Sequence, residues 1–294
     1  MATLNSQMPL DQLSQRRRVR NRSATRHAQI NFFAEEISGR MFERLDYIKV
    51  EPRVILDLHC ALGASSWQLA KRFPGALVIP CDPAIELLKR HVVAKKRFLR
   101  FGKNSTRICG EALALPIAAK SVDLIWSNLF PLSFDAPAII REIKRVLKPG
   151  GLLMLSTLGP DSLKELRAAY SQVDSLPHIQ PQVDMHDLGD MLAHEGFATP
   201  VVDMEILTLT YPDVKTIAGD LRAAGTANLE PNRRSTLTGK SRWVQLEQGY
   251  EAKRSEGRLP VTFEIIYLHA WRGVERIATD GRQIIQFNQM TAKK

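Results

Sequence analysis

The chain has 294 residues, a formal net charge of +10 and 44% hydrophobic residues. This length suits one large domain with an insertion, and the hydrophobic content is sufficient for a core, so we do not expect wholesale disorder. No apolar run approaches the roughly 18 residues that a membrane helix needs, and the N-terminus lacks the apolar stretch of a signal peptide. We therefore expect a cytoplasmic protein without a membrane contact.

The cysteines give no sign of a metal site or of a disulfide framework. Cys60, Cys81 and Cys109 lack metal-ligand spacing, and an odd number of cysteines fits no closed set of disulfides. The sequence therefore predicts no bound metal and a reducing compartment.

Basic residues gather in two segments, QRRRVRNRSATR (15–26) and KRHVVAKKRFLRFGK (89–103). Such an excess favours an anionic partner, either nucleic acid, a membrane surface or an acidic protein, although two solvated faces explain it equally well. Neither segment has the interleaved aromatic residues of single-stranded nucleic-acid binding. Nucleic acid is therefore the less favoured partner.

The first part of the chain indicates a basic arm, residues 1–29, followed by a domain from 30 to 294. The domain opens with Phe33, Ile37, Met41 and Leu45 at helical spacing. Strands are then expected at 54–58, 76–80, 106–109, 122–127 and 152–158, with helices at 63–73, from Pro83, and at 136–147. This alternation predicts an α/β, Rossmann-like fold with a parallel sheet that is covered on both faces.

The later part of the chain has a different pattern. Amphipathic helices are expected at 161–172 and 184–196, and strands at 201–211 and 261–272. The two late strands suit an antiparallel pair at the sheet edge, which gives a seven-stranded, mostly parallel sheet. The helix-rich stretch between them, about 212–258, would project as a cap over the carboxyl ends of the strands.

Acidic and amide residues follow each of the first four strands. Asp57 precedes the loop 58–63, Asp82 ends the second strand, and Glu111 and Asn128 follow the third and fourth. Each alone is a common cap or turn residue. Together they lie where open α/β sheets bind ligands, and an acid such as Asp82 commonly accepts bonds from a ribose diol. The pattern indicates a nucleoside-containing cofactor, and the absence of G-x-x-x-x-G-K-[ST] excludes a P-loop.

A dinucleotide and S-adenosylmethionine both use this crevice, and the late strand pair with Lys-Pro-Gly-Gly at 148–151 favours the second. The chain resembles class I S-adenosylmethionine-dependent methyltransferases. It looks most like the malonyl-[acyl-carrier protein] O-methyltransferases of biotin synthesis and related methyltransferase-like assembly factors. The resemblance runs from about residue 20 to 272, and its most specific segments are ERLDYIKVEPRVILDL, SVDLIWSNL, REIKRVLKPGGLLMLSTLGPDSLKELR, DMHDLGDMLAHEGF and GRLPVTFEIIYLHAW.

The resemblance implies roles for individual residues. Asp57 and Gly63 match the first cofactor motif, Asp82 matches the ribose-binding acid, Glu111 stands near the expected adenine, and Asn128 belongs to the matching Ser-Asn-Leu. Three residues are candidates to contact the substrate by their region alone: Tyr170, Arg222 and Arg242. The implied substrate is the free carboxylate of a malonyl thioester on acyl carrier protein, and that partner is acidic, in keeping with the basic arm.

The cofactor loop departs from the family pattern. The family has Asp-x-Gly-x-Gly-x-Gly, whereas His59 and Ala61 replace two of the glycines here. Ala61 would be tolerated if its φ is negative, whereas we expect His59 to need a strained backbone. Further departures from the family affect the same inferred pocket: His27, Ala28, Ala34 and the segment FPLSF (130–134). Two hypotheses therefore stay open: an active carboxyl O-methyltransferase, and a catalytically impaired paralogue that acts as a binding or assembly protein. A nucleic-acid methyltransferase is a third, supported by charge alone.

Overall fold

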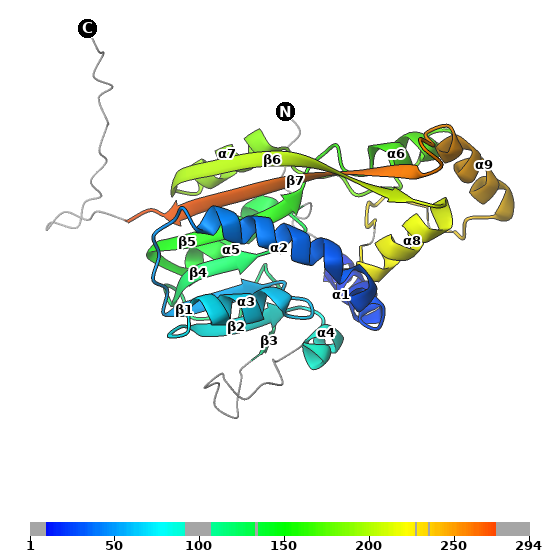
Figure 1. Cartoon of the computed structure of the whole chain (residues 1–294). Coiled ribbons are helices and arrows are strands. Elements are labelled where there is room, and N and C mark those ends of the chain that lie inside the picture. The colour runs from blue at the N-terminus through cyan, green and yellow to red at the C-terminus, as the bar shows by residue number, and fades with distance from the viewer. Residues whose placement is uncertain (1–9, 92–106, 133–134, 227, 235, 275–294) are drawn as a thin grey trace, which may run out of the picture.

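The computed structural model describes residues 10–91, 107–132, 135–226, 228–234 and 236–274. Most of the second basic segment, including Lys95, Lys96 and Arg97, lies outside the described residues. Figure 1 shows a twisted sheet with helices packed against it and two long strands along one edge.

The strands of the described part form one sheet in the order β3-β2-β1-β4-β5-β7-β6. Their bounds are β1 (Val54–Leu58), β2 (Leu77–Asp82), β3 (Ile108–Cys109), β4 (Val122–Ser127), β5 (Leu147–Leu158), β6 (Phe197–Tyr211) and β7 (Leu259–Arg272). The first five strands pair in parallel, whereas β7 runs antiparallel to both β5 and β6. The expected seven-stranded, mostly parallel sheet with an antiparallel edge pair is confirmed.

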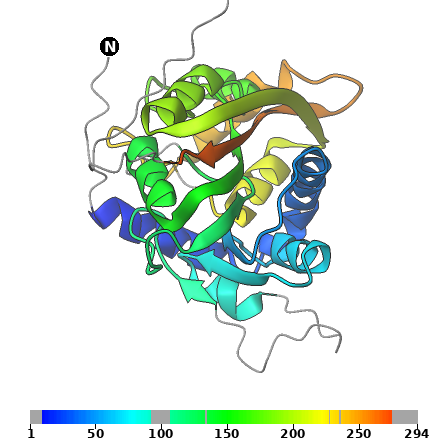
Figure 2. The ribbon, with the colours of Figure 1, turned by 90° about the vertical axis from the view of Figure 1, so that its left-hand side faces the viewer.

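Helices cover both faces of this sheet (Figure 2). The helices that precede β6 in the described part of the chain are α1 (Leu10–Ser23), η1 (His27–Ile30), α2 (Asn31–Leu45), α3 (Ala64–Arg72), α4 (Ile85–Arg90), α5 (Ala136–Val146), α6 (Lys164–Tyr170) and α7 (Met185–His194). Because side chains alternate along a strand, Ile55 joins the core under α2 and α3, whereas Leu56 joins the core under α5 and α7. The continuous apolar runs of the sequence reflect this burial on both faces.

The segment between β6 and β7 carries the helices of the cap, α8 (Val214–Ala223) and α9 (Lys240–Glu251). Both pack against the same core cluster as α2 and α6. In Figure 1, α8 lies beside α1 at the end of the sheet where the parallel strands terminate. The expected helical cap before the last strand is therefore present.

Two local features differ from the sequence expectations. The first basic segment, to which the sequence pattern assigned no helix or strand, is largely helical as part of α1. Strand β5 begins at Leu147 and runs through Lys-Pro-Gly-Gly, because Leu147 pairs with Val122 before the register shifts. Proline and glycine usually end a strand, but the register shift where β4 pairs with the start of β5 allows the strand to continue through them.

Candidate active site

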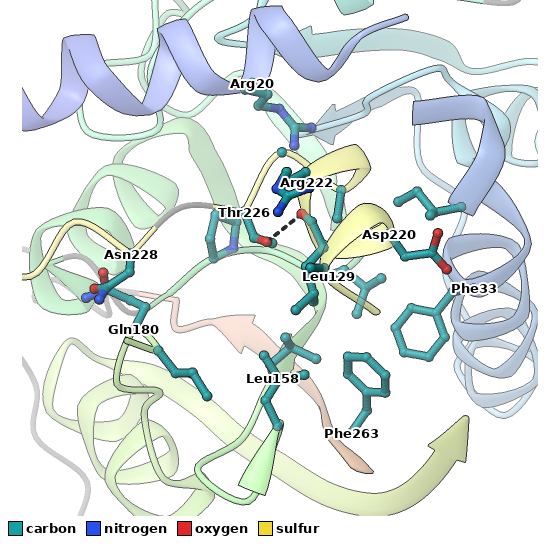
Figure 3. Close-up of a pocket in the computed structure, with 18 of the residues that line it drawn as sticks. Arg20, Phe33, Leu129, Leu158, Gln180, Asp220, Arg222, Thr226, Asn228 and Phe263 are labelled. Carbon is teal, nitrogen blue, oxygen red and sulfur yellow. Dashed lines mark hydrogen bonds between the residues drawn. The ribbon is translucent and has the colours of Figure 1, made fainter. Parts of the chain in front are cut away.

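A cavity of about 610 Å³ lies between the carboxyl ends of the parallel strands and the cap. In the close-up of Figure 3, Arg20 and Arg222 lie toward one end and Leu158 and Phe263 toward the other. Phe33 packs against Phe263 with 4.8 Å between the ring centroids. The cavity thus combines a cationic end with an apolar one, which suits an anionic group carried on an apolar chain or linker.

The loop after β1 keeps a left-handed backbone despite its side chains. His59 has φ 64°, Ala61 has φ 49° and Gly63 has φ 84°. The condition under which Ala61 would be tolerated, a negative φ, is therefore not met, and His59 has the strained backbone that its side chain was expected to need. Left-handed conformations at non-glycine residues cost about 1 to 3 kcal/mol each. The His59 ring lies edge-on to Phe130, with 5.5 Å between the ring centroids. Burial is the main cause that holds the pKa of His59 well below its usual value, and the positive charge of Arg20 adds to it, so the ring is neutral.

Asp57 faces α3 rather than the cavity. It is almost fully buried and accepts a hydrogen bond from Ser66 Oγ, which lies 3.1 Å from Nε2 of His91. Burial raises the pKa of Asp57 to about 7, the charge of Asp82 adds to the rise, and the bonds from Ser66 oppose it. His91 also closes the approach to Gly63, because a Cβ at Gly63 would lie 2.1 Å from its Nε2.

Asp82 is fully buried and paired with Arg20 of α1. The guanidinium binds in a bidentate manner, with Nε 2.9 Å from Oδ1 and Nη2 2.6 Å from Oδ2. The backbone amides of Ala61 and Ala84 donate to the same carboxylate. Burial alone would raise the pKa of Asp82, but the charge and hydrogen bonds of Arg20 outweigh it and hold the value near 2. This carboxylate is therefore ionised at neutral pH.

Glu111 and Asn128 line the cavity. The Asn128 amide donates to the carbonyl of Ala34 at 2.6 Å and accepts from Ser156 Oγ at 2.9 Å. Burial raises the pKa of Glu111, and the charges of Arg16 and Arg17 oppose that rise. The two residues lie on the side of the cavity that the ends of β3 and β4 form.

Of the three substrate candidates, Tyr170 and Arg222 line the cavity, whereas Arg242 does not. Tyr170 stacks on His178 with 3.9 Å between the centroids. Burial raises the pKa of Tyr170 against the nearby charge of Arg222, so its hydroxyl stays protonated at neutral pH. The structure thus brings together an arginine and a phenol that both can donate to an anion.

Arg20 and His91 are the residues that sequence reasoning missed in this site. Arg20 looked like one member of a basic run, and its partner lies 62 residues away. A single arginine beside several others gives no local signal of burial. Only the packing of α1 over the ends of β1 and β2 distinguishes it from its neighbours.

The chemistry of the cofactor residues fits S-adenosylmethionine, but their arrangement does not. The carboxylate of Asp82 is bonded to Arg20, and the approach to Gly63 is filled by His91. In this conformation two places that the resemblance assigns to the cofactor hold side chains of the chain itself. Within the residues described, no group of His, Cys, Asp and Glu side chains could hold a metal ion. No helix among them is long and apolar enough to cross a membrane.

The sheet order, the reversed β7 and the crevice at the strand ends define a class I methyltransferase. Residues 55–151 match the family model described as "Methyltransferase domain". The chain is 45% identical over 254 residues to the malonyl-[acyl-carrier protein] O-methyltransferase of Gallionella capsiferriformans, which covers 85% of this chain and 88% of that one. It is 41% identical to the protein of the same name from Methylovorus sp. strain MP688, over 92% and 93% of the two chains. The chain belongs to the malonyl-[acyl-carrier protein] O-methyltransferase family.

Solved structures with lower sequence identity share the fold. The YcgJ protein of Bacillus subtilis aligns with a TM-score of 0.56 at 18% identity, over 81% of this chain and 99% of that one. A putative methyltransferase of Bacillus halodurans aligns with a TM-score of 0.55 at 15% identity, over 81% and 99%. At these identities the likeness concerns the fold alone.

Proposed function

We propose that this protein transfers a methyl group from S-adenosylmethionine to the free carboxylate of a malonyl thioester on acyl carrier protein, a step of biotin precursor synthesis. The observation that carries the proposal is the 45% identity to a relative of that name over 85% of the chain. The cavity supports it, because Arg222 and Tyr170 offer donors for an acceptor carboxylate.

The proposed chemistry asks little acid–base work of the protein. When bound, the cofactor would supply an electrophilic methyl group and leave as S-adenosylhomocysteine once the methyl C–S bond breaks. An ionised carboxylate is already nucleophilic, so no general base is required. Arg222 would pair with the carboxylate and orient it, while Tyr170 would donate a hydrogen bond from its neutral hydroxyl. Phe33, Leu158 and Phe263 would exclude water from the malonyl group and its linker.

The residues proposed to hold the cofactor are those that the resemblance named: Asp57, Gly63, Asp82, Glu111 and Asn128. Glu111 and Asn128 line the cavity, and Asp82 lies behind Arg20. Asp57 would act from the second layer, through Ser66 and the start of α3. The acidic carrier protein is the proposed partner, with the exposed Arg17 and Arg18 of α1 as its contacts.

A second function has one observation in its favour. Arg20 and His91 occupy places that a cofactor would need, which suits a paralogue that keeps the fold and binds a partner without methyl transfer. Such a protein would bind the acylated carrier protein or act in assembly. The two functions predict the same binding surface and differ in turnover.

Methyl transfer to malonyl-loaded acyl carrier protein, measured by mass spectrometry of the carrier, separates the two. The wild type should produce the methyl ester, and Arg222→Ala should lower the rate roughly 10- to 150-fold, as expected for loss of one charge-assisted pair of about 1.5 to 3 kcal/mol. Arg242→Ala, an exposed arginine of α9 outside the cavity lining, is the matched control and should keep the wild-type rate. Binding of the loaded carrier without detectable ester would reject the methyltransferase and favour the binding function.

A further inference from the structure

The carboxylate of Asp82 has no acceptor position left. Oδ1 accepts from Arg20 Nε and from the Ala84 amide, each at 2.9 Å. Oδ2 accepts from Arg20 Nη2 at 2.6 Å and from the Ala61 amide at 3.0 Å. An ionised carboxylate offers about four lone-pair positions. A ribose diol therefore cannot bond to Asp82 while Arg20 is in place.

Arg20 supplies two of the four donors to Asp82, and these two can be withdrawn without moving the loops that carry the other two. The amides of Ala61 and Ala84 belong to the loops that shape the crevice, whereas Arg20 reaches in from α1 and lines the cavity (Figure 3). Its two parallel N–H groups present to the carboxylate what the two hydroxyls of a vicinal diol would present. The guanidinium thus holds the bonds that a ribose would make.

We propose that Arg20 is an internal stand-in for the cofactor's ribose, so that α1 closes the cofactor site and S-adenosylmethionine binds only to the form in which the Arg20–Asp82 pair is broken. This inference rests on the proposed function, since it takes Asp82 as the ribose acceptor. It explains why a member of a cofactor-dependent family has a ribose-binding carboxylate whose hydrogen-bond acceptor positions are all occupied.

The attachments of α1 suit a segment that opens. At one end of the site Asn21 Oδ1 accepts from the Glu86 amide at the start of α4, at 2.9 Å. At the cap, Nδ1 of His27 lies 3.2 Å from the carbonyl oxygen of Ala223, and Gly225 packs closely on Ser23. Among the α1 side chains described, Arg20 and Ser23 are the buried ones, and both are polar. Besides the Arg20–Asp82 pair, Gln15 Oε1 accepts from Arg233 Nη2 at 3.1 Å. A helix with polar attachments and little apolar burial belongs to the low-stability part of a fold.

The charge of Asp82 makes the closed form the resting state. Arg20 keeps this buried carboxylate ionised, so withdrawal of α1 leaves a charge that water or a ligand must then solvate. A diol restores the two hydrogen bonds without restoring the positive charge. The apparent affinity for cofactor is then the intrinsic affinity multiplied by the open fraction, which is small.

The first test is titration calorimetry of the full chain with S-adenosylhomocysteine, which carries the same ribose. Arg20→Ala should bind it at least tenfold more tightly than the wild type, a gain of about 1.4 kcal/mol. Arg22→Ala removes an exposed arginine of the same helix that does not line the cavity, and should bind as the wild type does. Equal or weaker binding by a folded Arg20→Ala would overturn the proposal.

Because Arg20→Ala strands a buried carboxylate, the variant can fail to fold, so the second test uses the wild type. Trypsin cleaves after arginine, and α1 carries Arg16, Arg17, Arg18, Arg20 and Arg22. Saturating S-adenosylhomocysteine should speed cleavage within 16–22, because the ligand selects the form in which α1 has withdrawn. Protection of this segment, or an unchanged rate with ligand bound, would refute the closure.

The two proposals fail separately. If Arg20→Ala binds the ligand tightly but no variant methylates the malonyl thioester, the closure stands and the proposed reaction falls. If the wild type methylates that substrate while Arg20→Ala shows no gain in affinity, the reaction stands and the closure falls.

Discussion

At the scale of single residues, the loop at His59 and Ala61 keeps a backbone conformation typical of glycine although both glycines are replaced. Both occupy left-handed conformations that glycine adopts without cost, and the turn still returns the chain to α3 through Gly63. The substitution pattern alone indicated strain at His59. It could not indicate which side chains fill the space beside the loop, because Arg20 and His91 arrive from other elements.

Replacing both residues by glycine tests this loop. His59→Gly with Ala61→Gly should tighten S-adenosylhomocysteine binding at least tenfold, about 1.4 kcal/mol, because the imidazole no longer lines the cavity and the backbone can approach the ligand. Calorimetry of the double variant and the wild type measures the change. Gly75→Ala, in a surface turn with open space for a Cβ, is a control for glycine content elsewhere. Equal micromolar binding by both proteins would mean that the loop tolerates its side chains.

At the scale of elements, hydrophobic patterning predicted the sheet and the cap well. Strands β1 and β4 begin and end where the apolar runs do, and β6 and β7 pair as the late strands suggested. Helix α1 was missed because it has no apolar stripe to signal it. Its position depends on the Arg20–Asp82 pair and on contacts near His27, which are tertiary interactions that no local period encodes.

The buried His27 predicts how stability changes with pH. Burial, followed by the charge of Arg20, lowers the pKa of His27 to about 4 from 6.5. Below pH 6.5 His27 binds a proton in the unfolded chain, whereas in the folded chain it binds one only near pH 4. The free energy of unfolding therefore falls as the pH falls through this window. Between pH 7 and pH 5 the free energy of unfolding should therefore fall less in His27→Gln than in the wild type, by on the order of 1 to 2 kcal/mol. Urea denaturation at both pH values measures this difference.

The control for this prediction is His186→Gln, since His186 is exposed on α7. It should leave the pH dependence of unfolding as in the wild type. His91, with a pKa also lowered to about 4 mainly by burial, keeps some acid sensitivity in both variants. Asp57 acts in the opposite direction, because its raised pKa makes the fold lose stability as the pH rises toward 7. A His27→Gln slope equal to that of the wild type would contradict the burial assigned to His27.

At the scale of the whole molecule, part of the basic excess lies on α1, beside the cavity. Arg17 and Arg18 are exposed on α1, beside the mouth that Arg20 and Arg222 line. Charge composition indicated an anionic partner without its position. The structure places these arginines over the strand ends, so a carrier protein bound there would have its acyl group near the cavity.

Neutralising the two exposed arginines of α1 tests this surface. Arg17→Ser with Arg18→Ser should slow association with acyl carrier protein roughly three- to tenfold at low salt, because charge complementarity acts mainly on the association rate. The difference should shrink as salt shortens the Debye length below about 8 Å. Surface plasmon resonance at two ionic strengths gives both rates. Lys49→Ser with Arg53→Ser, exposed at the opposite ends of the strands, is the matched control. Tight nucleic-acid binding without carrier-protein binding would contradict the surface and the malonyl-ester reaction together.

Helix α1 would join the two binding events energetically, because the helix that carries the exposed Arg17 and Arg18 also carries the buried Arg20. An acidic protein that holds the exposed arginines away from the sheet would also withdraw Arg20 from Asp82. By thermodynamic linkage, whatever factor the carrier protein adds to cofactor affinity, the cofactor must add to carrier affinity. A site that binds its nucleoside weakly in isolation would then fill when the acyl chain arrives, so that cofactor is engaged only when there is a carboxylate to accept its methyl group.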